Sequence, residues 1–190
     1  MLPACQYPFS VSAPTHVILS CPNTVWVDAC AELGRFAIIL ISPTLSRVFA
    51  LRLPPRFHGH KRQQAAELYA CKAAVTKCSL FLPESSQVKL ISDSVSSIFT
   101  LVKFSTKARH TLRGRLLRQV SKLVSQCRFR FFMGFIRSAA NPADAPSRCL
   151  TNFNGPPSRA CINQCNKALP LVVWSHQEDC TPPKYSPGLF

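Results

Sequence analysis

Three short apolar segments, rich in β-branched and aromatic residues, follow one another at residues 24–28, 36–42 and 48–53. Leu33-Gly34 and Pro43 interrupt them, so we predict three strands in an antiparallel meander. Residues 63–80 change to helix-forming composition, and residues 87–92 form a fourth predicted strand. A short helix at 94–104, a basic helical segment at 103–122 and a fifth strand at 128–136 follow. This order indicates an α/β fold with helices packed on a mixed sheet.

Proline marks both ends of the predicted domain. Residues 1–23 hold four prolines and no hydrophobic period, which predicts an N-terminal arm. Residues 24–150 form the predicted domain, a usual size for one hydrophobic core. Residues 151–190 are rich in proline and cysteine and are predicted to be a separate C-terminal tail.

The charge of the chain is strongly positive, with 23 Lys+Arg against 8 Asp+Glu and a formal net charge of +15. Such an excess favours a polyanionic partner, of which nucleic acid is the commonest, whereas an anionic membrane surface is less favoured. No segment reaches the roughly 18 apolar residues of a membrane span. The N-terminus has no basic region before an apolar core, so we expect no signal peptide. We therefore expect an intracellular protein, in the cytoplasm, the nucleus or a virus-like particle, with reduced cysteines.

Four of the eight acidic residues occupy related positions. Asp28 and Asp93 each end a predicted strand, Glu67 lies early in the predicted helix, and Asp144 follows the fifth strand. If the strands of Asp28 and Asp93 are parallel neighbours, all four carboxylates converge at one edge of the sheet. Like charges at such spacing are unfavourable unless a cation compensates them. Two Mg²⁺ ions would do so and would support phosphoryl displacement, so a basic protein with this site is consistent with a nuclease.

The surrounding residues resemble a known family. Val27-Asp28-Ala29, Ala65-Ala66-Glu67-Leu68 and Ile91-Ser92-Asp93-Ser94 are similar to three motifs of ribonuclease H domains from retroelements and reverse-transcribing viruses. The fourth motif is Asn141-Pro142-Ala143-Asp144-Ala145-Pro146-Ser147-Arg148. It resembles the form found in hepadnavirus polymerases and tyrosine-recombinase retrotransposons, and more loosely that of gypsy-type retrotransposons. The resemblance covers about residues 25–148.

The resemblance implies a ribonuclease H-like fold, with a mixed five-stranded sheet of three antiparallel and then two parallel strands flanked by helices. It implies an endonuclease that uses two Mg²⁺ or Mn²⁺ ions to cleave the RNA strand of an RNA–DNA hybrid. Asp28, Glu67, Asp93 and Asp144 would be its catalytic metal ligands. A reverse transcriptase domain or polyprotein would be its partner. One departure is that no histidine lies between His110 and His176, where many family members carry a catalytic one.

The basic segment offers candidate nucleic-acid-binding residues, although a solvated helix face would show the same pattern. The candidates are Arg109, Arg113, Arg115, Arg118 and Lys122.

The tail holds a second candidate metal site. Its residues are Cys161, Cys165, His176 and Cys180, which are ligand types for zinc. The spacing is not that of a zinc knuckle, so the favoured interpretation is an unstructured tail without zinc.

The sequence is therefore consistent with three functions. The first is a metal-dependent ribonuclease H from a retroelement or viral polymerase. The second is a catalytically inactive, nucleic-acid-binding remnant of such a domain. The third, an integrase-like polynucleotidyl transferase, is less favoured because integrases of this fold typically end their acidic set with Glu on a late helix.

Overall fold

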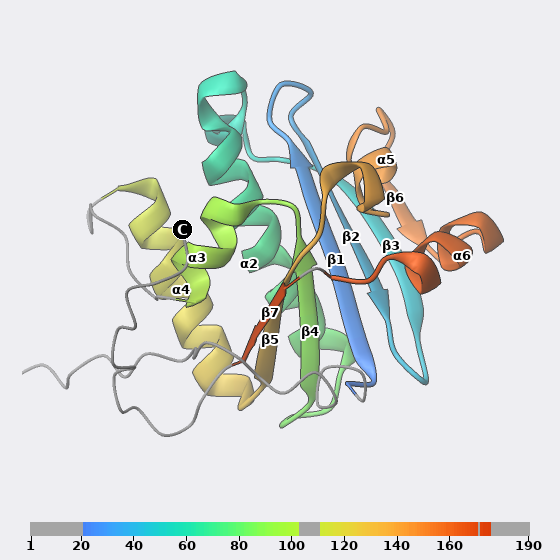
Figure 1. The fold of residues 1–190 in the computed structure, drawn as a ribbon. Coiled ribbons are helices and arrows are strands. Elements are labelled where there is room, and N and C mark those ends of the chain that lie inside the picture. Colours follow the sequence, from blue (N-terminus) through green and yellow to red (C-terminus); the bar gives the residue numbers. More distant parts are fainter. Residues whose placement is uncertain (1–20, 103–110, 171, 176–190) are drawn as a thin grey trace, which may run out of the picture.

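The structure of the chain, a computed structural model, describes residues 21–102, 111–170 and 172–175 (Figure 1). A single mixed sheet of seven strands runs through these residues in the order β6-β3-β2-β1-β4-β5-β7. Its strands are β1 (Asn23–Cys30), β2 (Arg35–Ile41), β3 (Ser46–Arg52), β4 (Gln87–Ser92), β5 (Arg130–Phe135), β6 (Phe153–Gly155) and β7 (Val172–Ser175).

The first five strands pair as predicted. β1, β2 and β3 form the antiparallel meander, β4 lies parallel to β1, and β5 lies parallel to β4. The predicted count of five is too low, because β6 adds antiparallel to β3 and β7 adds antiparallel to β5. Both extra strands come from the predicted separate tail, so the sheet continues past residue 150. The division of the chain into three regions remains a prediction.

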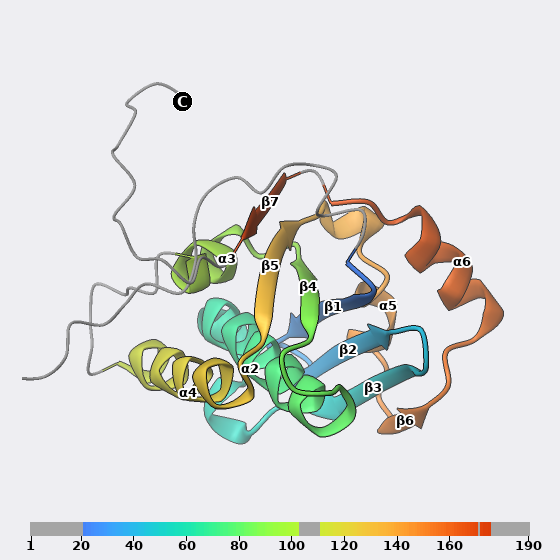
Figure 2. The ribbon, with the colours of Figure 1, turned by 90° about the horizontal axis from the view of Figure 1, so that it is seen from below.

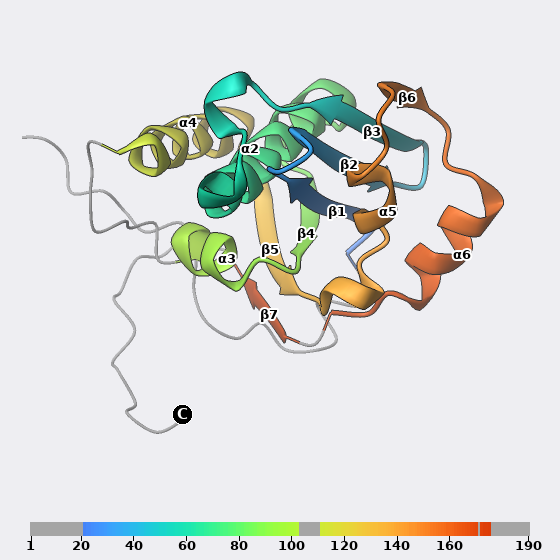
Figure 3. The ribbon, with the colours of Figure 1, turned by 90° about the horizontal axis from the view of Figure 1, so that it is seen from above.

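Helices cover both faces of the sheet (Figures 2 and 3). On one face lie α2 (Gln63–Phe81), α3 (Val95–Val102) and α4 (Leu112–Cys127). On the other lie the short α5 (Asp144–Ser147) and α6 (Arg159–Lys167). The 3₁₀ segments η1 (Pro55–Phe57) and η2 (His60–Arg62) lead into α2, and η3 (Ser138–Ala140) precedes α5.

The two faces have separate cores. Val25 and Val27 of β1 point into the larger core with α2 and α4. Trp26 points the other way, into a smaller core that includes Cys165 of α6. Because side chains alternate along a strand, Asp28 lies on the same face as Trp26. This face is the one that α5 covers, since α5 contacts β1, β2 and β3.

The basic segment differs from its prediction at both ends. α4 begins at Leu112, where the Thr111 hydroxyl accepts a hydrogen bond from the Gly114 N–H, and it ends at Cys127, where Arg128 caps the helix with a left-handed φ of 53°. Residues 103–110, part of the predicted helix, lie outside the described residues. No helix in the described residues is long and apolar enough to span a bilayer.

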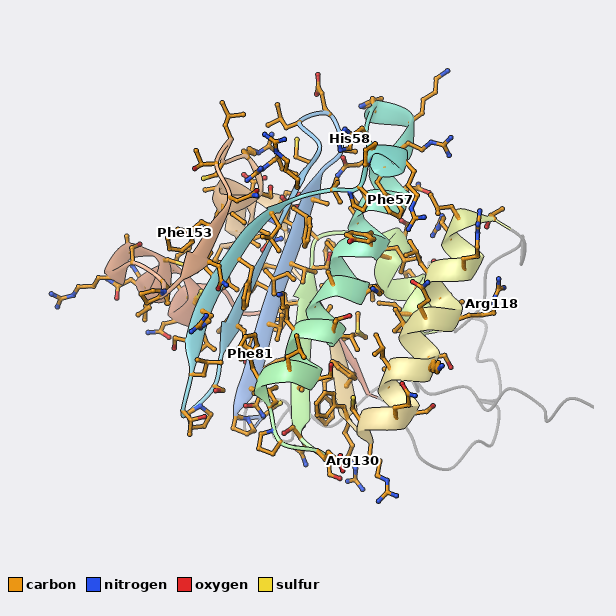
Figure 4. The ribbon with its side chains drawn as sticks, turned by 180° about the vertical axis from the view of Figure 1, so that it is seen from behind. Phe57, His58, Phe81, Arg118, Arg130 and Phe153 are labelled. Carbon is orange, nitrogen blue, oxygen red and sulfur yellow. The ribbon has the colours of Figure 1, made fainter. Side chains whose placement is uncertain are left out.

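The loop that leads into α2 is packed closely against the β1–β2 turn. Phe57 is fully buried, and its ring centroid lies 4.6 Å from that of Tyr69 on α2 (Figure 4). His58 bonds through Nε2 to the Leu53 carbonyl, and its ring lies against Gly34. Gly34 has a φ of +62°, which glycine adopts without steric cost. These contacts fix the end of the sheet at which Asp28 lies.

Candidate active site

Parallel pairing of β1 with β4 brings two of the candidate carboxylates side by side. The last aligned pair of residues is Val27 with Ser92, and the next residue along the chain is an aspartate in both cases: Asp28, still within β1, and Asp93, directly after β4. Both therefore lie at the same edge of the sheet, where the carboxyl ends of parallel strands meet.

Asp28 is buried, with 7% of its surface exposed. Burial raises the pKa of its carboxyl from 3.8 to about 7, and the nearby charges of Asp93 and Asp144 act in the same direction. Hydrogen bonds from the Ser147 hydroxyl and the Ala29 backbone oppose this rise in pKa. Asp28 thus lies within electrostatic range of both other aspartates, in a setting that disfavours its negative charge.

Asp144 is the first residue of α5, directly after the turn that begins at Asn141 and Pro142. The Asn141 amide donates to the Val27 carbonyl at 3.0 Å and to Asp93 Oδ1 at 3.4 Å. These bonds fasten the turn to the ends of β1 and β4. Asp144 is half-buried and forms an ion pair with Arg148, with 2.9 Å between Oδ1 and Nη2.

Glu67 reaches the same end of the sheet from α2. Its carboxylate accepts hydrogen bonds from the Ser94 hydroxyl and from Gln63 Nε2, the latter at 3.0 Å. Ser94 follows Asp93 directly, so Glu67 is linked to the end of β4. Gln63 also binds the Ala29 carbonyl and the Ala31 N–H, which links Glu67 to the end of β1.

The oxygen atoms of these carboxylates are suitable ligands for a divalent cation, but the carboxylates lie too far apart in this structure to bind one together. Carboxylate oxygens are the donors that Mg²⁺ and Mn²⁺ prefer, and Asp28 lies within electrostatic range of both Asp93 and Asp144. However, no three Asp, Glu, His or Cys side chains among the described residues are grouped closely enough to hold a metal ion as they stand. Glu67 is bound by Ser94 and Gln63, and Asp144 is paired with Arg148.

The candidate nucleic-acid-binding residues divide into three groups. Arg115, Arg118 and Lys122 are exposed on α4, and Arg118 points away from α2 (Figure 4). Arg113 is half-buried and donates to Gln64 on α2 and to Thr100 on α3, at 2.9 and 2.7 Å. It therefore fastens α4 to the other two helices rather than facing solvent. Arg109 lies outside the described residues.

Only half of the candidate zinc set is described. Cys161 and Cys165 lie one turn apart on α6, and burial raises the pKa of the Cys165 thiol to about 12, which opposes formation of a thiolate. His176 and Cys180 lie outside the described residues. The zinc set therefore remains a prediction.

Four polar residues bind the candidate carboxylates or the strands beside them, although the sequence does not predict these contacts. Asn141 and Ser147 belong to the fourth motif, but nothing in the sequence indicates what they bind. Gln63 lies four residues before Glu67 on a helix, a spacing that places the two side chains together. Ser94 is adjacent to Asp93, but its bond to Glu67 depends on the packing of α2 beside α3, which Ser94 directly precedes.

Neither protein-family models nor curated proteins match the sequence. Solved structures do match. RNase H1 from the halophilic archaeon Halobacterium salinarum has a TM-score of 0.52 and 14% identity, with 67% of this chain and 96% of that chain covered. The N-terminal RNase H domain of Rv2228c from Mycobacterium tuberculosis, in a fusion with maltose-binding protein, has a TM-score of 0.47 and 16% identity. That match covers 66% of this chain and 95% of the other. The first likeness shows that the chain, with its mixed sheet flanked by helices, has a ribonuclease H-like fold.

Proposed function

We propose that the chain is a metal-dependent ribonuclease H, an endonuclease that cleaves the RNA strand of RNA–DNA hybrids. The observation that carries the proposal is the electrostatic proximity of Asp28, Asp93 and Asp144 at one edge of a ribonuclease H-like sheet. Glu67, on α2, is hydrogen-bonded to the residue that follows Asp93. Their order along the chain is that of the four carboxylates of the family.

The four carboxylates would hold two Mg²⁺ or Mn²⁺ ions. Bound cations of this kind supply an activated water and stabilise charge on the phosphate. Asp28 lies within electrostatic range of both other aspartates and would be the ligand shared between the ions. Its burial excludes water, which strengthens its attraction for a cation. Release of Asp144 from Arg148 would free a carboxylate oxygen for binding.

The exposed basic residues of α4 would bind the phosphate backbone of the hybrid. Arg115, Arg118 and Lys122 carry positive charge on the face of α4 that is not packed on α2. Binding of this kind is independent of sequence and weakens steeply with salt. The 2′-hydroxyl groups of the RNA strand would distinguish a hybrid from DNA.

The fourth motif supports an origin in a retroelement or viral polymerase, with a reverse transcriptase domain as partner. Its Asn-Pro-Ala-Asp-x-Pro-Ser-Arg form at residues 141–148 is the most specific part of the resemblance.

The proposal is tested by cleavage of an end-labelled RNA–DNA hybrid by the full chain in Mg²⁺ or Mn²⁺. Asp93→Asn should abolish cleavage. Glu67→Gln should lower it strongly, whereas Glu84→Gln, a matched change on an exposed loop outside the site, should leave it unchanged. Equal cleavage by the wild type and Asp93→Asn would contradict the proposed site.

The second candidate is a catalytically inactive nucleic-acid-binding remnant. The spacing of the carboxylates favours it, because no three acidic, His or Cys side chains in the described part of the chain are close enough to hold a cation as they stand. It predicts salt-sensitive binding to duplexes without any cleavage that depends on Asp93. The same hybrid, measured for binding and for cleavage, separates the two candidates.

A further inference from the structure

The structure points to two residues that position the candidate carboxylates. We infer that Asn141 and Ser147 hold Asp28, Asp93 and Asp144 at one edge of the sheet, from which binding of a divalent cation would draw the three carboxylates closer together. The inference rests on the proposed function. It concerns residues that are not themselves cation ligands, since their amide and hydroxyl groups donate hydrogen bonds to the carboxylates.

Asn141 joins three parts of the fold through one side chain. It is 1% exposed, and its Nδ2 donates to the Val27 carbonyl at 3.0 Å and to Asp93 Oδ1 at 3.4 Å. Its Oδ1 accepts a hydrogen bond from the Ala143 N–H at 3.1 Å. The end of β1, the carboxylate that follows β4 and the start of α5 are therefore tied to a single amide. No apolar side chain could replace these bonds, and each buried polar group would lose its partner.

Ser147 makes the corresponding connection between the other two aspartates. It is fully buried, and its hydroxyl donates to Asp28 Oδ2 and lies 2.8 Å from the backbone carbonyl of Asp144. Asp144 begins α5 and Ser147 ends it. The hydroxyl therefore fixes the position of α5, and with it Asp144, relative to the carboxylate of Asp28.

The chemistry of these two contacts favours a role in cation binding over one in stability alone. An amide and a hydroxyl orient carboxylates without neutralising them, whereas Lys or Arg in their place would cancel the negative charge. Arg148 pairs with Asp144 at the exposed side of the site. The contacts to Asp28 and Asp93 thus place no positive charge beside these carboxylates, which leaves them available to a divalent cation.

The chain contains matched residues for a control. Asn23 is buried at the opposite end of β1, where its amide donates to the Gln87 carbonyl at 2.8 Å. Ser42 is buried in the β2–β3 turn, and its hydroxyl bonds to the backbone of Leu45. Both make structural hydrogen bonds of the same type, and neither bonds to a carboxylate.

The test is Mn²⁺ binding to the full chain without nucleic acid, measured by titration calorimetry and by the electron paramagnetic resonance signal of free Mn²⁺. Ser147→Ala and Asn141→Ala should each weaken Mn²⁺ binding by roughly 10- to 100-fold, as is typical for residues that orient metal ligands. Ser42→Ala and Asn23→Ala should lower the melting temperature without changing Mn²⁺ affinity. Circular dichroism and melting in EDTA check that each variant folds.

Mn²⁺ affinities of Ser147→Ala and Asn141→Ala equal to those of the two controls would overturn the inference. Ser147→Ala removes one oxygen atom and decides the question alone if Asn141→Ala does not fold. Asp28→Asn separates this outcome from failure of the proposed function. If Asp28→Asn binds Mn²⁺ as the wild type does, the proposed cation site is wrong. If it loses binding while the Ser147 and Asn141 variants retain it, the positioning role alone is wrong.

Discussion

Replacement of Asp28 by Asn should stabilise the protein in the absence of metal, and more so at high pH. Burial raises the pKa of the Asp28 carboxyl from 3.8 to about 7. When the pKa of an acid is higher in the folded than in the unfolded state, ionisation of that acid destabilises the folded protein. Stability therefore falls as the pH rises from about 4 to about 7, and is constant with respect to this group above that range.

The size of the effect follows from the two pKa values. A tenfold change in an acid constant corresponds to about 1.4 kcal/mol, so the rise from 3.8 to about 7 destabilises the folded protein by roughly 4 kcal/mol at pH 8. At pH 5 the same linkage gives roughly 2 kcal/mol. The amide introduced by Asp28→Asn is neutral at both pH values, so the advantage of this variant should grow by roughly 2 to 3 kcal/mol between pH 5 and pH 8.

Urea unfolding in EDTA at pH 5, 6, 7 and 8 measures this difference for the wild type and Asp28→Asn. Comparison of the two proteins at each pH cancels the titration of all other groups. Addition of Mg²⁺ at pH 8 should stabilise the wild type and leave Asp28→Asn unchanged, because a ligand of the folded state raises its stability by mass action. A constant difference between the two proteins across the pH range would refute the argument from burial.

Two further predictions concern the loop at the site and the basic helix. Gly34→Ala should destabilise the protein by roughly 2 kcal/mol or more, since it combines a left-handed φ with a Cβ placed 2.7 Å from the His58 ring. In a His58→Ala background, Gly34→Ala should lower the free energy of unfolding by only about 1 kcal/mol, because the clash with the His58 ring is gone. Urea unfolding measures both losses. Equal losses in the two backgrounds would exclude a steric contribution from His58. Replacement of both Arg115 and Lys122 by Gln should weaken hybrid binding and lower the slope of log affinity against log salt by about 2. Fluorescence anisotropy across a salt series measures this slope. Lys167→Gln on α6, on the other face of the sheet, serves as a control. An unchanged slope in the double variant would exclude α4 from the interface with the hybrid.

The sequence alone predicts the central elements of the fold, because each is specified by local composition. β-branched and aromatic runs ended by turn residues predict β1 to β5, and the helix-forming stretch predicts α2 over residues 63–80, close to Gln63–Phe81. Local pattern also places Asp93 directly after β4, whereas the end of the first predicted strand at Asp28 is wrong by two residues, because β1 continues to Cys30 through its pairing with β2. Parallel neighbours then necessarily bring the two aspartates to one edge of the sheet.

Features that depend on partners distant in the sequence were decided only by the tertiary structure. β6 and β7 have three and four residues, too few for a local signal, and each exists because an edge strand offers it free backbone groups. Arg113 resembles its basic neighbours in the sequence but turns inward, where Gln64 and Thr100 accept its hydrogen bonds. Ser147 and Asp28 are 119 residues apart, and no local pattern relates them. Their contact arises because α5 packs on the face of β1 that carries the carboxylate.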